Sequence, residues 1–258
     1  MLTSCEDMFE YSPYVIDFDE ENRNVNSKNI VKVETQSNTD KIIRIAFTAD
    51  THRNSDKLDE FVHSVNQLNK TKPIDFVIHL GDFADFGLPK QYIWANGYLS
   101  KLNMPYLVVL GNHDLVGNGS DSYYKMFGDF NTSFIYEKIK FISINTNSRE
   151  FEYNGSVPSI NWLDTQLKPN TNYTKAVILF HVPPMDVDFD NNLEDSFVAT
   201  LSKNNNVILA VHGHLHHYDI YRPYDKSITF LNVYAIENEK YNVVELASDT
   251  FKIITYDL

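Results

Sequence analysis

The chain has 258 residues, and its composition of 43% apolar and 22% charged residues is typical of a globular domain and excludes a disordered chain. Its formal net charge of −13 argues against a partner such as long DNA or RNA, because binding a phosphate backbone requires a basic surface. A single cysteine excludes a disulfide framework within one chain, and no apolar run approaches the roughly 20 residues that span a bilayer.

Residues 1–40 are rich in Asn, Asp, Glu and Ser without a sustained apolar period, which predicts an extended leader or tether. Within it, Leu2-Thr3-Ser4-Cys5 resembles the lipobox that precedes the acylated cysteine of bacterial lipoproteins. The charged start and apolar region of a signal peptide do not precede Cys5. If such a region lies upstream, we expect a lipid anchor on Cys5 and a location in the bacterial cell envelope. The alternative is a lone free cysteine in a cytoplasmic protein.

From Lys41 onward, short β-branched runs and amphipathic segments follow one another as they do in βα units. Strands are predicted at 42–49, 76–80, 106–110, 134–136, 140–144, 176–180 and 207–211, and helices at 56–69, 89–102, 120–127, 160–167 and 193–203. After His216 only strands are predicted, at 219–221, 228–232, 241–245 and 251–256. This order predicts an α/β domain over residues 41–258, with one mixed sheet or two sheets packed together, flanked by helices.

Polar side chains that can bind metals follow the predicted strands, at the edge where α/β sheets collect their ligands. The segments are Asp50-Thr51-His52, Gly81-Asp82-Phe83-Ala84-Asp85, Gly111-Asn112-His113-Asp114, His181-Val182-Pro183 and Gly213-His214-Leu215-His216. Their carboxylate, imidazole and amide groups form an oxygen and nitrogen donor set that suits Mn, Fe or Zn. In extended backbone, residues two apart share a face, so Asp50 and His52, and likewise His214 and His216, are predicted to face one pocket.

The ordered set DxH, GDxxD, GNHD, HxP and GHxH resembles the calcineurin-like metallophosphoesterase superfamily. The resemblance implies two mixed β-sheets packed as a sandwich and flanked by helices. It also implies two metal ions with a water or hydroxide between them, the first held by Asp50, His52, Asp82 and His216 and the second by Asp82, Asn112, His181 and His214. His113 would then contact the phosphoryl group and protonate the leaving oxygen, and Asp114 would orient His113.

The activity that the resemblance implies is hydrolysis of a phosphate ester at a dinuclear metal centre. The motifs look most like the cyclic-nucleotide phosphodiesterase branch, so we expect a small phosphodiester as substrate. A phosphomonoester is the alternative substrate. A protein of another class would keep the fold and use the metal face only to bind a partner, but the complete ligand set and His113 argue against it. No tyrosine lies among residues 83–85, which argues against a purple iron–tyrosinate site.

The remaining histidines have simpler explanations. His79 and His212 lie in apolar runs and are predicted to be buried core residues. His63 is predicted on a helix surface, and His217 alternates away from His216. Asp85 is predicted to support the centre rather than bind a metal ion.

Overall fold

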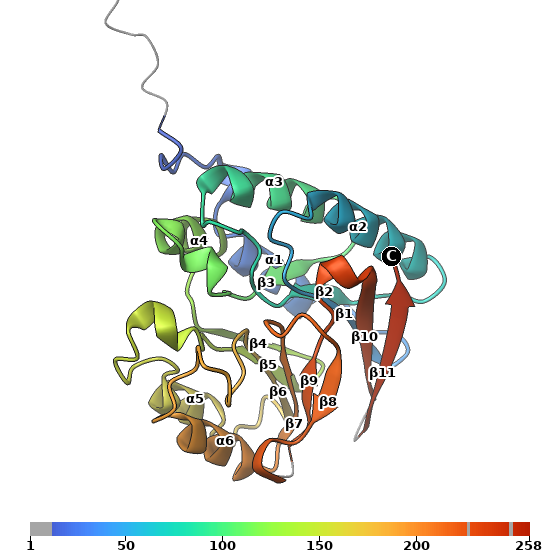
Figure 1. Ribbon diagram of the computed structural model, residues 1–258. Coiled ribbons are helices and arrows are strands. Elements are labelled where there is room, and N and C mark those ends of the chain that lie inside the picture. The colour runs from blue at the N-terminus through green and yellow to red at the C-terminus, as the bar shows by residue number, and fades with distance from the viewer. Residues whose placement is uncertain (1–11, 226–227, 248–249) are drawn as a thin grey trace, which may run out of the picture.

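The computed structural model describes residues 12–225, 228–247 and 250–258. Two β-sheets pack face to face, and helices cover the outer face of each sheet (Figure 1). In the described part of the chain, no helix is long and apolar enough to cross a membrane.

The first sheet has five strands in the order β11-β10-β1-β2-β3. Their bounds are β1 Ile43–Thr48, β2 Phe76–His79, β3 Tyr106–Val108, β10 Lys240–Ala247 and β11 Thr250–Asp257. β1, β2 and β3 are parallel, whereas β10 and β11 are antiparallel to their neighbours. Three helices cover the outer face of this sheet, namely α2 (Ser55–Asn69), α3 (Pro89–Leu99) and α4 (Gly119–Phe127).

The second sheet has six strands in the order β4-β5-β6-β7-β9-β8. Their bounds are β4 Thr132–Tyr136, β5 Ile139–Ser143, β6 Lys175–Leu179, β7 Val207–His212, β8 Asp219–Tyr221 and β9 Phe230–Asn232. The inner four strands are parallel and the two edge strands are antiparallel. Helices α5 (Ile160–Gln166) and α6 (Glu194–Ser202) cover its outer face. The prediction of two mixed sheets flanked by helices is therefore confirmed.

The core lies in three layers, one between the sheets and one under each set of helices. Between the sheets, the Phe76 ring of the first sheet packs edge-on against Phe141 of the second at a centroid distance of 5.2 Å. On the helix side, α2 buries Leu58, Phe61, Val62 and Val65, the spacing of one helical face. The central strands are buried on both faces, which explains their continuous apolar sequences.

The prediction of an extended leader over residues 1–40 is wrong for residues 25–35, which form helix α1 (Val25–Thr35). The buried Asn26 side chain accepts the Val108 N–H at 2.9 Å and donates to the Val108 carbonyl oxygen at 2.8 Å. Asn29 donates to the Tyr106 carbonyl oxygen at 2.8 Å. α1 thus covers the open edge of β3 with two buried amides beside Val25 and Val33, so its buried face has no sustained apolar period. Cys5 lies outside the described residues.

Candidate metal centre

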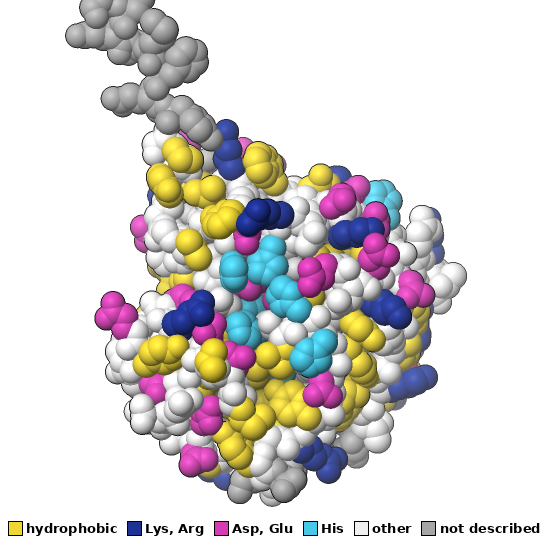
Figure 2. All heavy atoms as spheres, viewed as in Figure 1, with side chains coloured by type: hydrophobic (Ala, Val, Ile, Leu, Met, Phe, Trp, Pro, Cys, Tyr) yellow, Lys and Arg dark blue, Asp and Glu magenta, His cyan; other side chains and the backbone are white. Residues whose placement is uncertain are grey.

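The predicted metal-binding residues come together where the carboxyl ends of strands from both sheets meet. Asp50 and Asp82 follow β1 and β2 of the first sheet, whereas His181 and His214 follow β6 and β7 of the second. Histidine side chains gather on this face of the molecule, with acidic side chains among them (Figure 2). The packing of two sheets therefore brings motifs from distant parts of the chain into one site.

Asp50, His52 and His216 form the first group of candidate ligands. The Nε2 atoms of His52 and His216 lie 3.3 Å apart. His216 Nε2 lies 3.6 Å from Asp50 Oδ1, and His52 Nε2 lies 3.6 Å from Asp82 Oδ2. Asp82 therefore lies next to this first group.

Asp82, Asn112, His181 and His214 form the second group. The Asn112 Oδ1 atom lies 3.1 Å from His181 Nε2 and 3.2 Å from His214 Nδ1. Asp82 Oδ2 lies 3.3 Å from His181 Nε2. Because the same Asp82 oxygen also faces His52, this carboxylate lies between the two groups. The structure thus brings all seven predicted metal-binding residues together.

The backbone that carries these side chains is not extended. The reason given for the predicted pairing is therefore wrong, although both members of each pair do belong to the candidate ligand groups. Five of the residues are in the left-handed region, with φ of 56° at Asp50, 47° at His52, 53° at Asp82, 75° at His214 and 54° at His216. This conformation costs a non-glycine residue about 1 kcal/mol or more and is concentrated at functional sites. Tight turns, and not strand alternation, therefore aim the side chains inward.

The two buried carboxyl groups of the site, Asp50 and Asp82, differ in how burial and nearby histidines shift their pKa. Burial raises the pKa of Asp50 to about 6, although nearby histidines oppose the shift. Burial would also raise the pKa of Asp82, but the His181 imidazolium outweighs it and holds that pKa well below its usual range. Conversely, burial would lower the pKa of His181, and the Asp82 carboxylate raises it to about 10. The Asp82–His181 pair thus outweighs the effect of burial, whereas the histidines near Asp50 do not.

These atoms fit divalent metal ions. The ligand atoms of Asp50, His52 and His216, and those of Asp82, His181 and His214, all lie within 4.8 Å of one another in their groups. Two imidazole nitrogens at 3.3 Å need a proton or a cation between their lone pairs. His181 Nδ1 is engaged by the Leu80 carbonyl oxygen at 2.7 Å, which leaves Nε2 for the centre. Oxygen and nitrogen donors without sulfur suit Mn, Fe or Zn.

The prediction that Asp114 orients His113 is wrong. Its two buried carboxylate oxygens accept the backbone N–H groups of Ala84 at 2.7 Å and Gly111 at 2.8 Å. Burial, with repulsion from Asp82, raises the pKa of Asp114 to about 7. Asp85 is the residue beside His113, because His113 Nδ1 lies 3.0 Å from its carbonyl oxygen and 3.4 Å from its carboxylate. Asp114 therefore ties together the loops that carry Asp82 and Asn112.

Sequence reasoning missed several polar residues around the centre. Asp186 Oδ1 lies 3.2 Å from His214 Nε2, and Glu237 Oε1 lies 3.0 Å from His216 Nδ1. Two arginines stand at the rim: Arg149 pairs with Asp188 at 2.8 Å, and Arg53 pairs with Asp85. The acidic pair at 186 and 188, just after the HxP segment, was a usable signal. The sequence contains no comparable signal for Glu237, because it lies 21 residues after His216 and outside every motif.

His79 and His212 are buried in the core, as predicted. His79 Nε2 lies 2.7 Å from the Thr51 hydroxyl, and His212 Nε2 lies 2.8 Å from the Tyr221 hydroxyl. Burial lowers the pKa of each histidine to about 3, so both are neutral near neutral pH. His63 is exposed, as predicted, and His217 is exposed as well.

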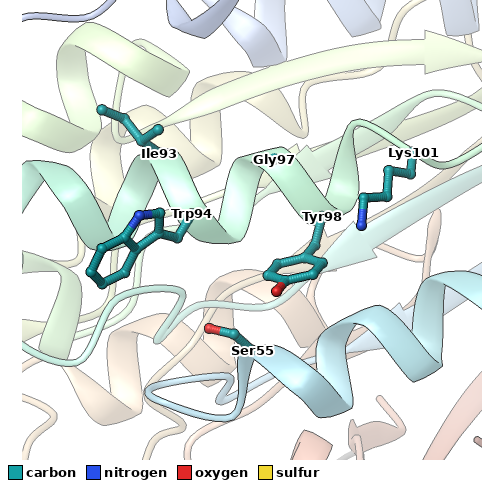
Figure 3. A pocket seen from close by; sticks show the side chains of 6 residues that line it. All are labelled: Ser55, Ile93, Trp94, Gly97, Tyr98 and Lys101. Atoms are coloured by element: carbon teal, nitrogen blue, oxygen red, sulfur yellow. The ribbon is translucent and has the colours of Figure 1, made fainter.

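A cavity of about 560 Å³ lies apart from these groups, between the start of α2 and the outer face of α3 (Figure 3). Its lining residues are Ser55, Ile93, Trp94, Gly97, Tyr98 and Lys101. None of the seven candidate ligands lines this cavity, so the candidate metal centre lies elsewhere.

The relatives of this chain among curated proteins include two bacterial proteins. The chain is 26% identical over 174 residues to a 3',5'-cyclic-nucleotide phosphodiesterase of Nostoc sp., covering 61% of this chain and 62% of that protein. It is 31% identical over 166 residues to a probable glycerophosphodiester phosphodiesterase of Arcobacter nitrofigilis, covering 59% of each chain. The alignments thus span about three fifths of the length of these two relatives.

Solved structures share the fold. A dimetal phosphatase from Danio rerio superposes with a TM-score of 0.64 at 13% identity, covering 84% of this chain and 99% of that one. GAP50, described as the anchor in the inner membrane complex of Plasmodium, superposes with a TM-score of 0.61 at 15% identity, covering 84% of this chain and 88% of that one. The family model described as calcineurin-like phosphoesterase matches residues 43–218. The chain belongs to the calcineurin-like phosphoesterase family.

Proposed function

We propose that this chain hydrolyses small phosphodiesters at a centre of two metal ions. The observation that carries the proposal is the convergence of seven oxygen and nitrogen ligands in two groups, with Asp82 between them. One ion would be held by Asp50, His52, Asp82 and His216, and the other by Asp82, Asn112, His181 and His214. Bound ions would supply positive charge to the phosphoryl oxygens and lower the pKa of an attacking water.

His113 is the residue suited to protonate the leaving oxygen. Its Nδ1 donates to the Asp85 carbonyl oxygen at 3.0 Å, which leaves Nε2 for the substrate. Its side chain is 41% exposed, so a substrate can reach it from solvent. Its backbone N–H donates to Asp82 Oδ1 at 2.9 Å, which ties the proton donor to the carboxylate between the ligand groups. Imidazole transfers protons effectively near neutral pH.

Two arginines lie at the rim of the centre, in a chain whose net charge is −13. The Arg53 guanidinium lies 4.8 Å from the centre of the Phe86 ring and pairs with Asp85. Arg149 lies on the other side of the centre, paired with Asp188 near His214. Because each arginine is paired with a carboxylate, most of the positive charge that attracts an anionic ester would come from metal ions bound at the centre.

A diester is favoured over a monoester because two relatives are named as enzymes that cleave small diesters, a cyclic nucleotide and a glycerophosphodiester. The ligand set itself serves both ester types. A purely binding role is disfavoured, because every ligand position holds a residue that can bind a metal ion and because His113, the candidate proton donor, is present.

The test is turnover of bis-p-nitrophenyl phosphate and p-nitrophenyl phosphate by metal-stripped protein, with manganese, iron, zinc or nothing added back. We expect metal-dependent cleavage with the higher kcat/KM on the diester. Preference for the monoester would overturn the diester assignment. Two bound ions without cleavage of either compound would contradict hydrolysis and favour a binding role. His63→Ala, which changes an exposed histidine on α2, is the matched control for substitutions of the site histidines.

A further inference from the structure

We infer that Glu237 and Asp186 are positioning residues for the two histidines of the GHxH segment, and that Glu237 sets the metal affinity of the more exposed half of the centre. Each carboxylate would fix which imidazole nitrogen faces a metal ion. The inference rests on the proposed function, because it requires metal ions at the centre.

Glu237 holds one end of the His216 ring. Its Oε1 atom lies 3.0 Å from His216 Nδ1, while His216 Nε2 faces Asp50 Oδ1 at 3.6 Å and His52 Nε2 at 3.3 Å. A neutral imidazole carries one proton, and a carboxylate can only accept it. The proton therefore belongs on Nδ1, and the lone pair of Nε2 is directed into the centre.

Asp186 contacts the His214 ring at Nε2, whereas Glu237 contacts the His216 ring at Nδ1. Here Nδ1 faces the centre, 3.2 Å from Asn112 Oδ1, and Nε2 lies 3.2 Å from Asp186 Oδ1. Asp188 Oδ2 lies further away, at 3.9 Å, and Asp188 is itself paired with Arg149 at 2.8 Å. The two histidines of one short segment thus need opposite tautomers, and each has its own carboxylate to impose one.

Glu237 lies in the connection that crosses from the second sheet to the first. This connection runs from β9 to β10 and contains the short 3-10 helix η5 (Ile236–Asn238). The Ile236 N–H donates to the Ala49 carbonyl oxygen at 3.0 Å, and Ala49 also forms a β-bridge with Ala235. Ala49 directly precedes Asp50, so the backbone around Glu237 is tied to a candidate ligand. These anchors are backbone contacts and survive truncation of the Glu237 side chain.

The two halves of the centre differ in exposure. The side chains of His52 and His216 are 15% and 39% exposed, whereas those of His181 and His214 are 0% and 15% exposed. Loss of an outer carboxylate lowers metal affinity by about 10–100-fold at characterised sites. We therefore expect the more exposed half, which contains His216, to depend on Glu237, and the buried half to depend on Asp186.

The experiment is calorimetric titration of the metal-stripped protein with Mn²⁺, supported by metal analysis after dialysis. Glu237→Ala is expected to weaken one of two sites by about 10–100-fold and leave the other unchanged. Glu237→Gln retains an acceptor oxygen without the charge, so it should restore part of the affinity if orientation matters. The matched control is Glu239→Gln, which removes the same charge two residues away, where Glu239 pairs with Lys57 at 2.8 Å.

A double substitution separates positioning from a general structural effect. In a His216→Ala background, Glu237→Ala should cause no further loss of metal affinity, because the group that it positions is gone. Additive losses, or two unchanged sites in Glu237→Ala, would overturn the inference. Uptake of no ion by the wild-type protein would overturn both the inference and the proposed function. Two ions bound, with the expected loss in Glu237→Ala but no ester cleaved, would support the inference and contradict the proposed function.

Discussion

His113 lies against Asp85, with its Nδ1 atom 3.0 Å from the Asp85 carbonyl oxygen and 3.4 Å from the carboxylate Oδ1. The same carboxylate lies 3.5 Å from His52 Nδ1 and pairs with Arg53. One acidic side chain therefore contacts the candidate proton donor, a candidate metal ligand and a cation at the rim. The candidate proton donor, His113, and the candidate metal ligand His52 are therefore adjacent at Asp85.

His113→Ala should retain both metal ions and lose catalytic rate, because His113 belongs to neither of the two proposed ligand groups and instead clusters with His52 and Asp85. Loss of a positioned general acid lowers kcat by about 10²–10⁴-fold. The loss should be larger for a diester with an alkyl leaving group than for a p-nitrophenyl ester, whose leaving oxygen needs no proton. Metal content and kcat of the purified variant check this expectation. Equal loss of metal and rate would show that His113 is a ligand.

Asp82→Ala should lose metal ions and activity together, because Asp82 lies between the two ligand groups. Its removal also leaves the His113 backbone N–H without its 2.9 Å acceptor. The bound metal per chain, measured after dialysis, should fall from two ions toward none or one. A variant that kept two ions would show that this carboxylate does not join the groups.

Asp114→Ala should destabilise the fold by about 2–6 kcal/mol, because two buried N–H groups, of Ala84 and Gly111, would lose their acceptors at about 1–3 kcal/mol each. The free energy of unfolding in urea, measured on metal-stripped protein, checks this value. Asp121→Ala, at an exposed position in the first turn of α4, should change stability by less than about 1 kcal/mol. Equal effects of the two substitutions would contradict the assigned role of Asp114.

Asn26→Ala should destabilise the protein by about 1–3 kcal/mol, because the Val108 N–H on the open edge of β3 would lose its partner. The Val108 carbonyl would keep the Tyr123 hydroxyl, which donates to it at 2.6 Å. Ser27→Ala, on the exposed side of α1, is the control. Urea unfolding that does not distinguish the two variants would indicate that α1 is not part of the packed domain.

The two sheets were predictable because their central strands are buried on both faces and therefore form nearly continuous apolar runs. Every strand and helix predicted after residue 41 overlaps an observed element. α1 was missed because Asn26 and Asn29, whose amides bond to β3, lie between Val25 and Val33 on its buried face and interrupt the apolar period. An apolar period measures hydrophobic burial and does not detect a helix that docks through hydrogen bonds.

The ligand motifs were readable because strand ends in this fold carry polar residues at one edge. The partners of those residues were harder to assign. Asp114 is adjacent to His113 in sequence, yet it faces the backbone, while Asp85 reaches His113 from another loop. Glu237 reaches His216 only through the connection between the sheets. Contacts between loops depend on how the two sheets pack, and local sequence does not encode that packing. The acylation of Cys5 and the envelope location stay predictions.

The buried neutral His79 should make stability depend on pH. Its pKa in the folded protein is lowered to about 3, mainly by burial, while the unfolded chain takes up the proton near 6.5. Its contribution to stability is therefore full above pH 6.5 and is lost as pH falls from 6.5 toward 3, by about 1.4 kcal/mol per pH unit. Urea unfolding of metal-stripped His79→Gln should show a shallower pH slope than wild type. Identical slopes would contradict the prediction.

The most direct test of a two-metal phosphoesterase is the rate of bis-p-nitrophenyl phosphate cleavage, measured while metal-stripped protein is titrated with Mn²⁺ and bound metal is counted in the same samples. The account predicts no cleavage without metal and a rate that reaches its maximum as two ions bind per chain. Cleavage that is already maximal in stripped protein, or that reaches its maximum with one ion bound, would contradict it.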